Sequence, residues 1–110
     1  MKMANNDKVP ELTNGEFDEF IKKGVAFVDF FAEWCMPCLM QSPIIEDLAE
    51  QLTEVKFVKI NKEDNEELTR KLGVASIPCL VIFKEGKEVE RIIGIHSAEV
   101  IEKKVRGHMC

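Results

Sequence analysis

The sequence lacks any apolar run long enough to cross a membrane. Its longest runs, VAFVDFFA and IPCLVIF, fall far short of the roughly 20 residues that a transmembrane helix needs. The N-terminal stretch MKMANNDKVP also lacks the apolar core and small-residue cleavage pattern of a secretory signal. Basic residues are not in excess, since 20 acidic residues stand against 15 basic ones that are scattered among Glu. We therefore expect no membrane partner, no nucleic-acid partner and a cytoplasmic location.

Internal repeats, low-complexity segments and linkers are absent as well. The 110 residues are 45% hydrophobic and 32% charged, which is typical of a soluble globular protein and not of a disordered or fibrous one. A chain of this length is long enough to bury a core of its own. We predict a single domain over residues 1–110, with loose termini at about 1–8 and 107–110.

The order of the predicted elements indicates an α/β fold. Residues 25–31 (VAFVDFF) are apolar on both sides, as in a strand buried on both faces of a sheet. Strands are predicted at 9–12, 25–31, 55–60, 79–83 and 89–93, the last two as a hairpin turning at Glu85–Gly86. Helices are predicted between a cap at Asn14 and Gly24, over 37–52, before Gly73, and from Ser97 to about Arg106. This order predicts a mixed sheet with helices on both faces.

Two cysteines, Cys35 and Cys38, stand where the buried strand passes into a predicted helix, beside Trp34, the only tryptophan. A structural disulfide closing so short a loop would contribute only about 2 kcal/mol, against about 4.7 kcal/mol for a 100-residue loop. A structural zinc ion needs four ligands, usually from a second pair at regular spacing. The remaining candidate ligands form no second CxxC motif: Cys79, His96, His108 and Cys110.

A redox-active pair is the third possibility and the one that the spacing favours. Cys35 lies near a helix N-terminus, where free amides and the helix dipole stabilise a thiolate. Cys38 is one turn further on and within disulfide reach, and Pro37 is tolerated in a first helical turn and stiffens it. An ordinary thiol with a pKa of about 8.5 is only about 3% ionised at pH 7, whereas one with a pKa near 7 is about half ionised.

Asp29 interrupts the otherwise apolar strand 25–31. An ionised carboxylate is costly among apolar neighbours, so we expect a raised pKa there. A carboxyl group of that kind suits proton transfer. The alternative is an aspartate at a strand bend whose side chain reaches water.

The segment VDFFAEWCMPC resembles the thioredoxin family. The tryptophan before the first cysteine, the proline before the second, and the aspartate six residues before the first all match. Further on, SIPCLVIFKEGKEVERIIG resembles the proline loop, hairpin and following glycine of that family, so that the resemblance covers roughly residues 10–105. It implies the thioredoxin fold, with a four- to five-stranded sheet, and protein-disulfide reductase activity without a bound cofactor or metal.

The resemblance also implies residue roles. Cys35 would be the attacking thiolate and Cys38 the resolving thiol, with Asp29 taking a proton from Cys38. Lys59 matches a lysine that pairs with this aspartate, although it is equally placed to be an exposed strand-end residue. Pro78 matches the cis-proline of the family, against the general expectation of a trans bond. The implied substrate-binding residues are Trp34, Met36, Pro37, Ile77, Pro78, Gly94 and Ile95.

The implied partners are disulfide-containing protein substrates and a thioredoxin reductase, with the chain acting as a monomer. Met36 departs from the glycine common in the family, which keeps a glutaredoxin-like or isomerase-like protein as an alternative. A redox-inert binding module is a further alternative, and the intact cysteine pair argues against it. We expect Cys79 to be a small buried strand residue, with an additional redox thiol as the other possibility. Cys110 is expected to be exposed, and both histidines to lie on the surface without partners.

Overall fold

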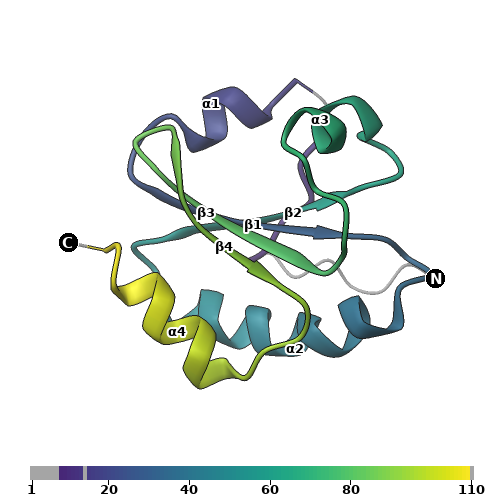
Figure 1. Cartoon of the computed structure of the whole chain (residues 1–110). Coiled ribbons are helices and arrows are strands. Elements are labelled where there is room, and N and C mark those ends of the chain that lie inside the picture. Colours follow the sequence, from purple (N-terminus) through teal and green to yellow (C-terminus); the bar gives the residue numbers. More distant parts are fainter. Residues whose placement is uncertain (1–7, 14, 110) are drawn as a thin grey trace.

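The chain, described by a computed structural model over residues 8–13 and 15–109, alternates helices and strands. Its elements are α1 (Phe17–Ile21), β1 (Val25–Phe31), α2 (Met36–Gln51), β2 (Lys56–Asn61), α3 (Glu66–Lys71), β3 (Cys79–Lys84), β4 (Lys87–Ile93) and α4 (Ala98–Arg106). Helices α1 and α3 cover one face of the sheet, and α2 and α4 cover the other (Figure 1). The α/β architecture predicted from the sequence is confirmed, while the cap predicted at Asn14 lies outside the described residues.

The sheet has the strand order β2-β1-β3-β4. Strand β1 runs parallel to β2 and antiparallel to β3, and β3 and β4 form the predicted hairpin. In the antiparallel register Phe30 pairs with Cys79, and Cys79 pairs with Ile93. The segments that follow β1, precede β3 and follow β4 therefore meet at one end of the sheet.

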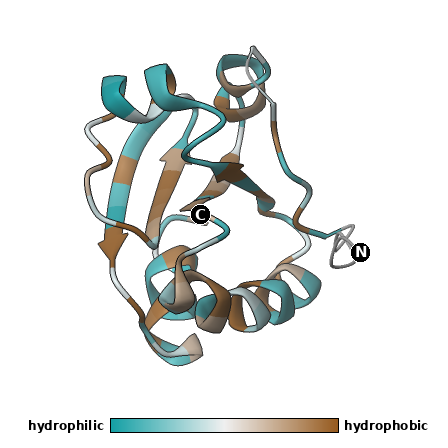
Figure 2. Ribbon diagram, turned by 90° about the vertical axis from the view of Figure 1, so that its right-hand side faces the viewer, coloured by the Kyte–Doolittle hydropathy of each residue, from teal (hydrophilic) through white to brown (hydrophobic). Residues whose placement is uncertain are grey.

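Alternate side chains of the central strands fill two hydrophobic layers. Towards α2 and α4 lie Val25, Phe27, Leu80, Ile82 and Ile92, packed with Ile45, Leu48, Ile101 and Val105 of the helices. Towards α1 and α3 lie Ala26, Val28, Phe30, Cys79, Val81 and Phe83, packed with Phe17 and Ile21. Figure 2 shows β3 largely in hydrophobic colours, whereas β4 at the edge alternates between hydrophilic and hydrophobic residues. None of the helices in the described part of the chain is long and apolar enough to span a membrane.

The edge strand predicted at 9–12 is reduced to one isolated bridge, between Glu11 and Lys59. Two backbone hydrogen bonds flank it: Leu12 donates to Lys59 at 2.9 Å, and Lys59 donates to Pro10 at 3.0 Å. Pro10 has no N–H of its own, so it accepts from β2 but cannot donate. This segment lies beside β2 without extending the sheet to a fifth strand.

Local residues explain the turn between β3 and β4 and the start of α4. Glu85 and Gly86 both have positive φ, 52° and 87°, as the two central residues of a type I′ hairpin turn require. Ser97 caps α4, because its side chain accepts a hydrogen bond from the Val100 amide. Residues 107–109, predicted to be loose, carry backbone hydrogen bonds back to α4, and Met109 packs against the core.

Ile101 tests the contribution of α4 to this core. Its side chain is fully buried, whereas the adjacent Val100 is 40% exposed. Ile101→Ala should lower the free energy of unfolding in urea by about 2–5 kcal/mol, because it leaves a cavity between α4 and the sheet. Val100→Ala is the control and should cost less than about 1 kcal/mol. Equal losses in the two variants would show that α4 does not pack as described.

Candidate active site

Cys35 and Cys38 form a disulfide across the first turn of α2, with their Cα atoms 5.2 Å apart. Cys35 is the N-cap of the helix, and its sulfur accepts a hydrogen bond from the Cys38 amide at 3.2 Å. Both residues are buried, and they pack with Ala32, Phe31 and Ile77 in a small cluster of their own. The cysteine sulfur therefore occupies the position in which capping side chains usually place an oxygen.

Local chain geometry explains this placement. After β1 the Cys35 amide donates to the Ala32 carbonyl at 3.1 Å, which turns the chain from the strand into α2. Pro37 stands in the first helical turn, where its missing N–H costs no hydrogen bond. A reduced Cys35 at this position faces free amides and the positive end of the helix dipole, which favour its thiolate.

The loops before β3 and after β4 form another side of the site. The Ile77–Pro78 peptide bond is cis, as the resemblance implies. Ile77 packs against the cysteine cluster, and Pro78 is buried beside it. The Pro78 carbonyl accepts from the Gly94 amide at 2.9 Å, which joins the loops before β3 and after β4. Gly94 has a φ of 90°, a conformation that a side chain would strain.

Asp29 is buried in the middle of β1, at 5% exposure. Burial raises the pKa of its carboxyl from 3.8 to about 7, and the positive charge of Lys59 opposes this shift without cancelling it. Among the described residues, none gives the buried Oδ1 atom of Asp29 a hydrogen bond. The carboxyl group is therefore half protonated near neutral pH and has an oxygen free to accept a proton.

Lys59 lies directly opposite Asp29 in the parallel register of β1 and β2. Its amine sits over the ring of Phe31, 5.5 Å from the ring centroid. No ion pair within 4.0 Å joins it to Asp29 in the described part of the chain. The side chain thus influences Asp29 through its charge at longer range, which is weaker than the direct pairing that the resemblance allows.

Apolar side chains surround the cysteine pair at the surface. Trp34 and Met36 are 65% and 63% exposed, and Ile95 on the other side is 45% exposed. The indole N–H of Trp34 donates to a carboxylate oxygen of Glu63, which fixes the large ring beside Cys35. Leu39 and Met40 of α2 are also exposed, so several exposed apolar side chains lie close in sequence to the disulfide.

Comparison with known proteins identifies the family. The thioredoxin family model matches residues 8–107. Thioredoxin from Chlamydia pneumoniae is 42% identical over 97 residues, which cover 88% of this chain and 95% of that protein. Thioredoxin from Bacillus subtilis is 35% identical over 102 residues, covering 92% and 98%. The chain belongs to the thioredoxin family.

Solved structures agree with the thioredoxin fold. A point mutant of thioredoxin from Halobacterium salinarum superposes with a TM-score of 0.87 at 30% identity, covering 99% of this chain and 97% of that chain. Oxidised mitochondrial thioredoxin 3 from Saccharomyces cerevisiae superposes with a TM-score of 0.86 at 28% identity, covering 94% and 99%. As a thioredoxin-family protein, the chain is a thiol-disulfide oxidoreductase with Cys35 and Cys38 as its redox pair.

Sequence reasoning missed one buried polar residue of this thioredoxin-family site, Gln41. Its side chain is fully buried and bonds both backbone groups of His96. A signal existed, because Gln41 falls on the buried stripe of α2 with Cys38 and Ile45. The pairing partner could not be read from the sequence, since it lies 55 residues away.

The expectation that both histidines lack partners is wrong. The His96 ring Nε2 lies 3.0 Å from the Ile93 carbonyl, and the His108 ring Nε2 lies 3.0 Å from a Glu90 carboxylate oxygen. The partner of His96 lies only three residues before it, whereas the partner of His108 lies 18 residues away and is brought to it by folding. Both histidines are half-buried as a result.

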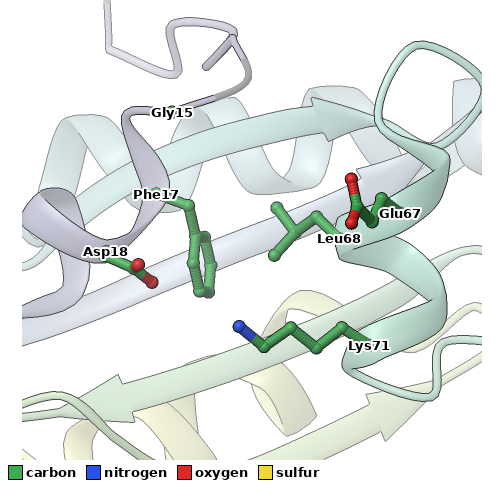
Figure 3. Close-up of a pocket in the computed structure, with 6 residues that line it drawn as sticks. All are labelled: Gly15, Phe17, Asp18, Glu67, Leu68 and Lys71. Atoms are coloured by element: carbon green, nitrogen blue, oxygen red, sulfur yellow. The ribbon is translucent and has the colours of Figure 1, made fainter.

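Cys79 and the pocket between α1 and α3 are two remaining candidate features in the described part of the chain. Cys79 is buried at 1% exposure on the α1/α3 side of the sheet, as expected for a small strand residue, and burial raises its pKa. Cys110 lies outside the described residues. A pocket of about 190 Å³ lies between α1 and α3, where Phe17 and Leu68 face each other (Figure 3), and contains none of the predicted site residues. In the described ranges, no three His, Cys, Asp or Glu side chains gather to hold a metal.

The raised pKa of Asp29 predicts a pH-dependent stability. The folded protein holds the Asp29 proton up to about pH 7, whereas the unfolded chain releases it near 3.8. The contribution of Asp29 to the free energy of unfolding is greatest below about pH 4. It falls by roughly 4 kcal/mol as the pH rises towards 7. Asp29→Asn should remove this fall and be the more stable protein at pH 8.

Urea unfolding of the oxidised wild type and of Asp29→Asn between pH 4 and 8 measures the difference, since disulfide-bonded cysteines do not titrate. Asp47→Asn, an exposed carboxylate on α2, is the matched control and should follow the wild type. Parallel curves for wild type and Asp29→Asn would contradict the assignment of Asp29 as a buried, neutral carboxyl group.

Proposed function

We propose that the chain reduces disulfide bonds in other proteins, with Cys35 as nucleophile and Cys38 as resolving thiol. The observation that carries this proposal is the position of Cys35 at the N-cap of α2, with Cys38 bonded to it one turn later. A pair that closes a loop of only four residues braces little, so its value lies in exchange and not in stability.

The first half of the reaction uses the helix terminus. The Cys35 thiolate attacks one sulfur of the substrate disulfide, forms a mixed disulfide with it, and releases the other substrate sulfur as a thiolate. The amides at the start of α2 stabilise the attacking anion before the reaction. The Ile77 backbone, which lies directly before β3 and packs against the cysteines, pairs with the substrate chain in this proposal.

The second half releases the reduced substrate. The Cys38 thiol loses its proton to Asp29, directly or through water, and then attacks the Cys35 sulfur. The bond between Cys35 and the substrate breaks, the second substrate sulfur leaves as a thiolate, and the Cys35–Cys38 disulfide forms. Two electrons pass from the protein to the substrate. A pKa of about 7 suits Asp29 for this step, because the group then exchanges protons at neutral pH. Lys59 opposes the shift and keeps part of the carboxyl ionised.

Substrate proteins bind, in this proposal, across the apolar face that surrounds the cysteines. Its residues are Trp34, Met36, Pro37, Ile77, Pro78, Gly94 and Ile95. The chain acts as a cytoplasmic monomer, and a thioredoxin reductase returns two electrons to the disulfide. No cofactor takes part, since thiolate exchange needs none.

A trapping experiment tests the residue roles. Cys38→Ser should hold a substrate such as insulin, with its disulfide bonds intact, as a stable mixed disulfide through Cys35, because no resolving thiol remains. Cys35→Ser should form no such adduct and should lose all reductase activity. Mass spectrometry of the non-reduced adducts provides the measurement. An adduct through Cys79, or equal trapping by both variants, would overturn the assignment.

Met36 makes a second experiment necessary, because a residue between the cysteines affects the potential and with it the electron donor. We expect a thioredoxin reductase with NADPH to reduce the Cys35–Cys38 disulfide at least tenfold faster than glutathione at physiological concentration. The opposite order would identify a glutaredoxin-like or isomerase-like protein. Reduction by neither, with a disulfide that stays closed, would identify a redox-inert binding module.

A further inference from the structure

Gln41 joins the helix that carries the cysteines to the loop that follows β4. Its side-chain N–H donates to the His96 carbonyl at 3.0 Å, and its side-chain oxygen accepts from the His96 amide at 2.8 Å. A backbone N–H only donates and a carbonyl only accepts, so the two bonds also fix which way the amide group points. Gln41 is fully buried, and it thus pairs with both the backbone N–H and the backbone C=O of His96.

The same loop is held at two further points. Upstream, the Gly94 amide donates to the Pro78 carbonyl at 2.9 Å. The His96 ring Nε2 lies 3.0 Å from the Ile93 carbonyl, which can only accept, so this nitrogen carries the proton. A continuous set of contacts therefore leads from the cis-proline through Gly94 and His96 to Gln41, three residues beyond Cys38.

Exposed apolar side chains stand on both of the segments that this connection joins. On α2 these are Met36, Leu39 and Met40, which are 52–63% exposed. On the loop and the end of β4 they are Ile93 and Ile95, which are 56% and 45% exposed. No other hydrogen bond between side chain and backbone in the described residues joins α2 to this loop. Besides the core packing that Ile92 shares with Ile45 and Leu48, the Gln41 pair is therefore the link that sets the spacing of the two groups.

We propose that Gln41 is a positioning residue for protein substrates, which fixes the Gly94–His96 loop against α2 and so presets the spacing of the two apolar groups. This inference rests on the proposed function and deepens it, because it explains how the site selects protein disulfides over small ones. A protein substrate contacts both groups, whereas a small disulfide needs only the Cys35 sulfur. A loop already fixed in its binding geometry does not have to be ordered when the substrate arrives.

The test replaces Gln41 with an apolar residue of similar volume. Gln41→Leu removes both hydrogen bonds and leaves the two His96 backbone groups to water, while the buried site stays filled. Two bonds that each lie at the low end of the usual net strength correspond to roughly a fivefold weaker preference for the preset loop. We therefore expect the insulin concentration at half-saturation to rise about fivefold, with the maximal rate of disulfide transfer within twofold of wild type. Reduction of a small aromatic disulfide should also stay within twofold.

Single-turnover kinetics separate these quantities. Pre-reduced protein is mixed with a series of insulin concentrations, quenched in acid and alkylated, and the loss of two labels is read by mass spectrometry. No reductase is present, so its own docking does not enter the result. Gln41→Met is measured in parallel, since its flexible side chain fills the same space if the leucine variant folds poorly. Gln51→Leu, the same change at the exposed glutamine of α2, is the matched control and should behave as wild type.

Two results would overturn the inference. One is half-saturation within twofold of the Gln51→Leu control in folded Gln41→Leu or Gln41→Met, which would make the glutamine pair a structural contact alone. The other is an equal loss with insulin and with the small disulfide, which would mean that the cysteine pair itself had been disturbed. A wild type that reduces neither disulfide would overturn the proposed function instead, so the two failures are distinguishable.

Discussion

Strand β1 lies between β2 and β3 and is covered by helices on both faces, so six of its seven residues are buried. Phe27, Val28 and Phe30 are fully inaccessible, and each contributes about 1.5–3 kcal/mol when it leaves water. Their combined gain exceeds the roughly 4 kcal/mol needed to keep Asp29 in the same strand without its charge. The protein can therefore hold a carboxyl group with a near-neutral pKa inside its core.

The position of β1 also decides where the cysteines stand. Its register with β3 and β4 brings the cis-proline loop and the Gly94 loop to the end where the chain enters α2. The redox pair thus forms at the start of α2, while its surroundings come from three segments: α2 itself, the cis-proline loop and the Gly94 loop. Hydrogen bonds join these segments directly: the Gly94 amide donates to the Pro78 carbonyl, and the Gln41 side chain donates to the His96 carbonyl. The chemistry is local, whereas the surface that selects a substrate is assembled from distant parts.

Features with a local cause could be predicted from the sequence. Residues 25–31 form a strand with the predicted limits, and Glu85–Gly86 form the predicted turn, because burial on both faces and positive φ each leave a pattern in neighbouring residues. The cis bond before Pro78 came from resemblance and not from local physics. The pairing of Gln41 with His96 and of Trp34 with Glu63 left no pattern, since each joins residues far apart in sequence. The prediction of an edge strand at 9–12 was wrong, because Pro10 has no N–H and this segment therefore offers β2 fewer hydrogen-bond donors.

The central claim is that Cys35 and Cys38 form a reducing pair, and its most direct test is their equilibrium potential against a glutathione series. Cys79 and Cys110 are replaced by serine in this measurement, so that only one pair titrates. The account predicts a value near the roughly −270 mV known for thioredoxin, below the roughly −220 to −260 mV that extraction gives for cytosolic glutathione. A value above about −200 mV would contradict it, because such a pair would accept electrons from glutathione and could not serve as a general reductant.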